Sequence, residues 1–193
     1  MNMHPDIVLA SGSARRRELL TQIGISFEVQ VTDIDESRRD GEPPFDYVER
    51  LALEKARAGR EMSGSRMPVL GADTIVLLDD QILGKPADRA EAAEMLRMLS
   101  NRDHEVLSAV AVNVPERPPE VLVNTTRVTF SEIPEAFILR YCADDEPLDK
   151  AGAYAIQGEP GIYVSRVEGS YSGVMGLPLF ETGRLLKSAG VIS

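Results

Sequence analysis

The chain has 193 residues, of which 43% are hydrophobic and 27% charged, so it is long enough to bury a substantial core. Its formal net charge of −10 argues against a protein that coats polymeric nucleic acid through a broad basic face. Small phosphorylated ligands stay possible, because they need only a local cluster of cations.

Cysteine and histidine usage narrows the chemistry further. The single Cys142 excludes an intramolecular disulfide, which suits a reducing compartment, and we expect a cytoplasmic protein. His4 and His104 offer no zinc cluster, so any metal would be a hard cation held by carboxylates. No apolar run approaches the length of a membrane span, and the N-terminus lacks the order of a secretory signal, so we expect no membrane partner.

Hydrophobic periodicity and turn signals predict mixed α/β structure. Strands are expected at 6–10, 27–32, 68–78, 81–83, 105–114, 121–130 and 161–167. Helices are expected at 15–23, 45–62, 89–99, 134–142 and 178–188. Strands and helices mix without a regular βαβ rhythm, which favours a mixed sheet with flanking helices in one domain, 1–193. The order of the strands stays open.

The first chemical signal is SGSARRR at 11–17, between a strand and a helix. Small residues let backbone amides approach a phosphate, and the helix N-terminus adds partial positive charge. Arg15 and Arg16 bring guanidinium groups to the same place. A plain turn with solvated arginines is the alternative, but basic residues in a first helical turn oppose the helix dipole unless an anion binds there.

The second signal is Lys55 on the helix 45–62. Its apolar arc is predicted to contain Phe45, Val48, Leu51, Ala52, Ala56 and Gly59. Lys55 falls in the middle of this arc, while Arg50, Glu54, Arg57 and Glu61 take the other side. A lysine on the inner face needs a carboxylate, a phosphate or an exit route for its ammonium group.

The third signal is Asp73, which interrupts the apolar strand 68–78. A carboxylate in such a place usually has a cation or a catalytic role. A structural salt bridge to Lys55 or Lys85 is the alternative, and the two readings are compatible. Glu36, in the acidic loop 33–44, is a weaker candidate, because acidic loops are usually only solvated.

Two further segments are rich in small residues, DEPLDKAGAYAIQG at 145–158 and GSYSGVMGLPL at 169–179. Glycine-rich structural turns are the default interpretation of both. Gln157 in the first segment can donate to and accept from the edge of a base.

Together these motifs resemble the Maf family of nucleotide pyrophosphatases along nearly the whole chain. The resemblance is carried by LASGSARR, RLALEKA, GADTIV, GKP at 84–86, DKAGAYAIQG and GSYSGVMGLPL. GADTIV and AYAIQG match the dTTP/UTP pyrophosphatase branch rather than the 7-methyl-GTP branch. Ala14 stands where the family usually has proline, which loosens the loop without removing a functional side chain.

The resemblance implies a fold similar to the inosine triphosphate pyrophosphatases: an elongated mixed β-sheet with flanking helices and two lobes around a cleft. It also implies a divalent cation, Mg²⁺ or Mn²⁺, a nucleoside triphosphate substrate and a possible homodimer. By matching position, Asp73 would accept the proton, and Glu36 and Asp73 would hold the metal. Substrate-binding positions would be Ser11, Arg15, Arg16, Lys55, Thr74, Lys85 and Gln157, with Arg15, Thr74 and Gln157 linked to substrate choice.

The resulting hypothesis is attack of water on the α-phosphorus of dTTP or UTP, with metal assistance and pyrophosphate as the leaving group. Two alternatives stay open. The chain could be a nucleotide-binding regulator, for example of cell division, or it could perform the same chemistry on 7-methyl-GTP.

Overall fold

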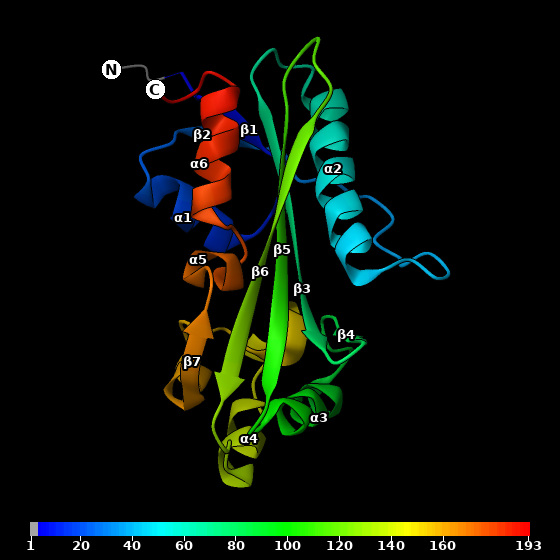
Figure 1. Ribbon diagram of the computed structural model, residues 1–193, viewed down its shortest axis with the longest axis vertical. Helices are drawn as coiled ribbons and strands as arrows, with labels where there is room; N and C mark the ends of the chain where they lie inside the picture. The colour runs from blue at the N-terminus through cyan, green and yellow to red at the C-terminus, as the bar shows by residue number, and fades with distance from the viewer. Residues whose placement is uncertain (1–3) are drawn as a thin grey trace. The chain divides into compact units, whose positions relative to one another are not determined.

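The computed structural model describes residues 4–193 (Figure 1). Within these residues, seven strands form one mixed sheet in the order β2-β1-β3-β5-β6-β7, with β4 paired to β3. β1 runs parallel to β2 and β3, whereas β4 is antiparallel to β3 and β7 is antiparallel to β6. The mixed α/β fold with flanking helices is confirmed.

The bounds of the elements agree closely with the predicted ones. The strands are β1 (Ile7–Leu9), β2 (Phe27–Val29), β3 (Val69–Leu78), β4 (Gln81–Leu83), β5 (Asp103–Asn113), β6 (Glu120–Phe130) and β7 (Val164–Glu168). The α-helices are α1 (Ala14–Gln22), α2 (Pro44–Ser63), α3 (Arg89–Leu99), α4 (Glu135–Tyr141), α5 (Tyr171–Met175) and α6 (Leu179–Ser188). Short 3₁₀ helices are η1 (Glu146–Asp149), η2 (Ala151–Ala153) and η3 (Glu159–Tyr163).

The described chain divides into two compact units. The first contains the residues up to Asp73 together with 108–124 and 176–193, and the second contains 74–107 and 125–175. β3, β5 and β6 therefore contribute residues to both units. This division matches the expectation of two lobes.

In the first unit, α2 packs closely on β1 and β3. The helix begins with proline at its first position, where no N–H is needed, and ends at Gly64, whose φ of 57° suits glycine. A Cβ on Gly71 of β3 would lie 2.5 Å from both the carbonyl oxygen of Ala52 and the amide nitrogen of Ala56. This close approach brings the buried face of α2 against the face of β3 that carries Asp73.

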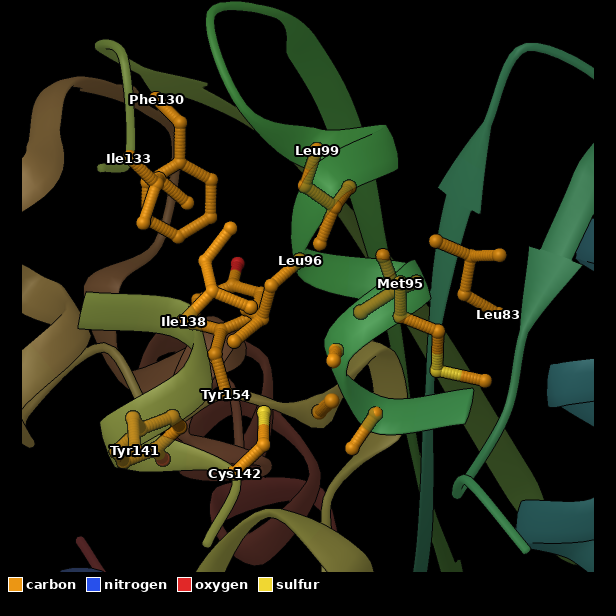
Figure 2. Close-up of a cluster of buried hydrophobic side chains, with 14 of the residues drawn as sticks. Leu83, Met95, Leu96, Leu99, Phe130, Ile133, Ile138, Tyr141, Cys142 and Tyr154 are labelled. Carbon is orange, nitrogen blue, oxygen red and sulfur yellow. The ribbon is translucent and has the colours of Figure 1, made fainter. Parts of the chain in front are cut away.

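The second unit has a large apolar core, shown in Figure 2. Asp88 caps α3 through a 2.8 Å bond from the amide of Glu91, as its place before the helix predicts. The core also contains a polar pair: His104 Nε2 lies 2.7 Å from the hydroxyl of Tyr154. Burial lowers the pKa of His104 to about 4, so this imidazole is neutral inside the core.

Three local predictions were wrong. Phe45, assigned to the buried arc of α2, is 46% exposed, because it lies in the first turn before the helix meets the sheet. The strand predicted from residue 161 begins at Val164, since the Pro-Gly pair before it forms η3. The glycine-rich segment after Gly169 contains the short helix α5, capped by a bond from the amide of Gly173 to Ser170 Oγ.

Among the residues described, no helix combines the length and the apolar composition needed to cross a membrane.

Candidate functional site

Asp73 and Lys55 form the centre of the candidate site. Asp73 lies on β3 and Lys55 on the facing surface of α2, and the side chain of each is only 10% exposed. The ammonium of Lys55 donates to Asp73 Oδ1 over 2.6 Å. The predicted inward direction of Lys55 is confirmed, and the salt bridge considered as the structural alternative is present as well.

Glu36 completes a three-membered charge cluster. Its Oε1 lies 2.8 Å from the ammonium of Lys55, so this single cation bridges two carboxylates. In contrast to Asp73, the side chain of Glu36 is 54% exposed. The acidic loop thus delivers one carboxylate to the cluster while keeping it open to solvent.

The loop that carries Glu36 is fastened to α2 by two side chains. Tyr47 donates its hydroxyl to the carbonyl oxygen of Glu36 over 2.7 Å. Arg50 binds both carboxylate oxygens of Glu42, at 2.6 and 2.9 Å, and donates to the carbonyl oxygen of Ser37 over 3.0 Å. The bond from Arg50 lowers the pKa of Glu42 to about 2, so this carboxylate remains charged at ordinary pH. Arg50 was predicted on the charged side of the helix, opposite the apolar arc, and its contacts with the loop leave its side chain only 13% exposed.

The strand–turn–helix segment around SGSARRR forms an ordered corner. Ser13 caps α1, and the amide of Ser13 donates to Ser11 Oγ over 3.2 Å. Arg16 donates through Nη1 to Ser11 Oγ over 3.0 Å and through Nε to the carbonyl oxygen of Gly176 over 2.8 Å. The guanidinium of Arg16 is therefore held in place and is not a free surface group.

Electrostatics connect this corner to the carboxylates. Burial lowers the pKa of the Arg16 guanidinium, the neighbouring charge of Arg15 acts in the same direction, and Asp73 and Glu36 oppose it. The first turn of α1 carries no acidic residue. Arg15, Arg16 and Lys55 thus supply three formal positive charges against the two carboxylates, at a helix N-terminus that already favours anions. Such an arrangement can accept a phosphorylated ligand beside a buried carboxylate.

The first unit contains six of the predicted site residues: Ser11, Arg15, Arg16, Glu36, Lys55 and Asp73. The remaining three belong to the second unit. Thr74 follows Asp73 on β3 and is half-buried, Lys85 is exposed after β4, and Gln157 is exposed between η2 and η3. Their roles stay predictions.

The carboxylates of the site fit the kind of metal ion that the family resemblance implies. Among residues 4–193, no group of three or more His, Cys, Asp or Glu side chains is placed to hold a metal ion. Glu36 and Asp73 offer two carboxylates around one cationic position, which Lys55 Nζ takes here. Mg²⁺ is commonly held by one or two carboxylates together with substrate phosphates and water, so the residues fit such an ion but not a zinc cage.

Sequence reasoning missed the residues that orient the site. The carbonyl of Gly176 is a backbone group with no signal in the side-chain pattern, although a φ of 118° explains why glycine stands there. Glu42 precedes Arg50 by eight residues and lies outside α2, so helical periodicity could not pair them. The short spacing between an acidic loop and a following arginine was the available signal.

Comparison with known proteins gives matches along nearly the whole chain. The family model described as "Maf-like protein" matches residues 6–189. A dTTP/UTP pyrophosphatase from Salmonella typhimurium is 53% identical over 93% of this chain and 91% of its own length. A protein of the same name from Shewanella oneidensis is 50% identical over 97% of this chain and 100% of its own length.

A solved structure supports the fold. It is described as a nucleoside-triphosphatase, or dITP/XTP pyrophosphatase, from Mycobacterium abscessus, and it is 19% identical with a TM-score of 0.50. The similarity covers 94% of this chain and 93% of that one. At this level of identity the likeness shows a shared fold alone.

Proposed function

Because the chain belongs to the Maf family, we propose that it hydrolyses dTTP and UTP to the nucleoside monophosphate and pyrophosphate. One observation carries the proposal: a buried aspartate is hydrogen-bonded to a buried lysine, and the charge of that aspartate acts on Arg16 in the first turn of α1. Relatives that are at least half identical over nearly the full chain bear the name of this activity.

The reaction requires a base, an anion site and a leaving-group site. Water attacks the α-phosphorus, and a proton of that water passes to the carboxylate of Asp73. The bond between the α-phosphorus and the oxygen that bridges it to the β-phosphorus breaks. The electron pair of that bond leaves with pyrophosphate. Phosphoryl transfer is accelerated mainly by charge stabilisation, which Arg15, Arg16 and Lys55 supply in this proposal.

Ser11 has a distinct part in this scheme. Its oxygen accepts bonds from the amide of Ser13 and from Arg16, which uses both acceptor positions of the hydroxyl. The hydroxyl hydrogen is then directed to a phosphate oxygen.

Glu36 and Asp73 would hold a divalent cation, Mg²⁺ or Mn²⁺. When bound, such an ion neutralises charge on the phosphate oxygens and acidifies nearby water. Lys55 must then share its two carboxylate partners with that cation. We assign the ammonium group to a phosphate oxygen in the substrate complex.

Substrate choice would depend on Thr74 and Gln157. Hydrogen bonds from both to a pyrimidine edge would reject other bases strongly, because a wrong base leaves polar groups unpaired. Lys85 would contact the phosphates. We also propose a cytoplasmic homodimer, since the single cysteine suits a reducing compartment and the family resemblance implies the dimer. Light scattering of the purified chain checks the dimer.

The proposal is tested with a panel of dTTP, UTP, CTP and 7-methyl-GTP, with Mg²⁺ and Mn²⁺ and detection of pyrophosphate. Asp73→Asn should lower turnover of dTTP and UTP by about 10²- to 10⁴-fold, the usual contribution of a general base. Asp79→Asn is the matched control, because Asp79 is exposed and has a φ of 53°, which asparagine tolerates. Stoichiometric binding of dTTP without turnover would instead indicate a nucleotide-binding regulator.

A further inference from the structure

Between β2 and α2 the chain forms no helix or strand over residues 30–43, yet it must hold a carboxylate at the site. Glu36 is 54% exposed, so apart from its ion pair with Lys55 its side chain has little packing to restrain it. What restrains this part of the loop is a set of hydrogen bonds from α2, the helix that also carries Lys55.

We infer that Arg50, Glu42 and Tyr47 are positioning residues, which order Glu36 before the divalent cation binds and thereby set the affinity for that cation. The inference rests on the proposed function of Glu36 as a metal ligand. It adds residues that are not among the proposed substrate and metal ligands.

The backbone around Glu36 is held at two consecutive carbonyl groups. Tyr47 Oη binds the carbonyl of Glu36 at 2.7 Å, and Arg50 Nη2 binds the carbonyl of Ser37 at 3.0 Å. Since both donors belong to one helix, the loop and Lys55 share one rigid support. Because the backbone carbonyl groups of Glu36 and of the next residue are both hydrogen-bonded, the backbone that carries this carboxylate has few other conformations to sample.

The Arg50–Glu42 pair closes the other end of the loop. The guanidinium binds the carboxylate in bidentate fashion, and the side chains are 13% and 9% exposed. Arg50 also binds Glu54 at 3.0 Å, and Glu42 accepts the amide of Arg39 at 3.1 Å. A bidentate pair with little exposure to water fixes geometry better than a surface ion pair does.

Without the hydrogen bonds from Tyr47 and Arg50, Glu36 would have to become ordered when the cation binds. The entropy lost in that ordering would make the binding free energy of the cation less favourable. The loss should therefore appear in cation affinity. Turnover should recover when the cation is saturating, because Asp73 and Lys55 do not depend on Glu42.

The test uses the full-length protein with Mn²⁺ and α,β-imido-dTTP, whose α,β bridge resists cleavage, and measures bound Mn²⁺ by electron paramagnetic resonance. Arg50→Gln and Glu42→Gln should each weaken Mn²⁺ binding about tenfold, as loss of outer-sphere support of metal ligands generally does. Glu36→Gln should weaken it at least as much. Arg97→Gln is the matched control, since it removes an equally short 2.6 Å pair with Glu135.

Two further measurements separate positioning from folding. Tyr47→Phe keeps the ring and removes one hydrogen bond, and it should weaken Mn²⁺ binding about fivefold. Hydrogen exchange without metal should become faster over residues 37–42 in Arg50→Gln and stay unchanged in Arg97→Gln.

Unchanged Mn²⁺ binding in Arg50→Gln and Glu42→Gln would overturn the inference. It would equally be overturned if saturating Mn²⁺ left the turnover defect of Arg50→Gln in place, or if Glu36→Gln bound Mn²⁺ normally. A wild-type protein that binds Mn²⁺ with the analogue but does not cleave dTTP would refute the proposed function and leave the positioning result standing.

Discussion

Removing the ammonium group of Lys55 should destabilise the protein, because the carboxylate of Asp73 loses its partner. In Lys55→Met, Asp73 stays buried without its ammonium partner, whereas the partly exposed Glu36 is solvated by water. Breaking one side of a buried ion pair costs about 3–5 kcal/mol, and partial access to water at Glu36 points to the lower end, about 3 kcal/mol. Asp73→Asn should cost less, about 1 kcal/mol, because Lys55 keeps Glu36 as a partner.

A double-mutant cycle isolates the interaction. Lys55→Met combined with Asp73→Asn should be more stable than the sum of the single losses predicts, with a coupling free energy of about 1–3 kcal/mol. Unfolding in urea is followed by circular dichroism, since the chain has no tryptophan, and EDTA is added so that no cation replaces the ammonium.

Glu36→Gln serves as the control for the cycle, with an expected loss of at most about 1 kcal/mol for an exposed partner. Additive effects of Lys55→Met and Asp73→Asn within about 0.5 kcal/mol would refute the idea that a buried charge pair holds the site.

Three further predictions concern the support of the site and its selectivity. Gly71→Ala should push α2 away from β3 and lower the free energy of unfolding by about 1–3 kcal/mol. It should also reduce turnover by more than this loss of stability explains. Gly183→Ala, whose Cβ meets nothing within 4 Å, should change neither stability nor turnover appreciably. His104 has a pKa of about 4 in the folded state against about 6.5 when unfolded, so the free energy of unfolding should fall by about 3 kcal/mol as the pH drops from 6.5 to 4, and should be independent of this group above pH 6.5. His104→Gln cannot titrate and should lose this slope in urea titrations, while parallel curves for the two proteins would contradict the assignment. Gln157→Ala should lower the ratio of kcat/KM for UTP over CTP by about tenfold in competition assays, and an unchanged ratio would remove Gln157 from base recognition.

Much of the architecture could be predicted from residue patterns, because the spacing of apolar residues indicates which face of a helix or strand is buried. The arc of α2 with Lys55 at its centre, and the interruption of the apolar strand β3 by Asp73, followed from spacing alone. Strand order could not be predicted in the same way, since it depends on contacts distant in sequence. The β5–β6 hairpin lies beside β3, and no local signal specifies that neighbour.

Local errors have local causes. Phe45 follows the apolar period of α2 but lies in its first turn, so periodicity assigned it a contact that the helix start does not offer. At the site, single polar residues on apolar faces were found because they break a pattern. Arg50 was missed because a charged residue among other charged residues does not interrupt the pattern of the helix. Its partner Glu42 lies in a loop, where no regular spacing of residues indicates a contact.

Hydrolysis of dTTP in H₂¹⁸O with Mg²⁺ tests the central claim most directly, because the label marks the phosphorus that water attacks. We predict that ¹⁸O appears in dTMP and not in pyrophosphate, and that Asp73→Asn forms labelled dTMP at a rate lower by at least about 10². Label in pyrophosphate, release of inorganic phosphate and dTDP, or wild-type rates in Asp73→Asn would contradict it.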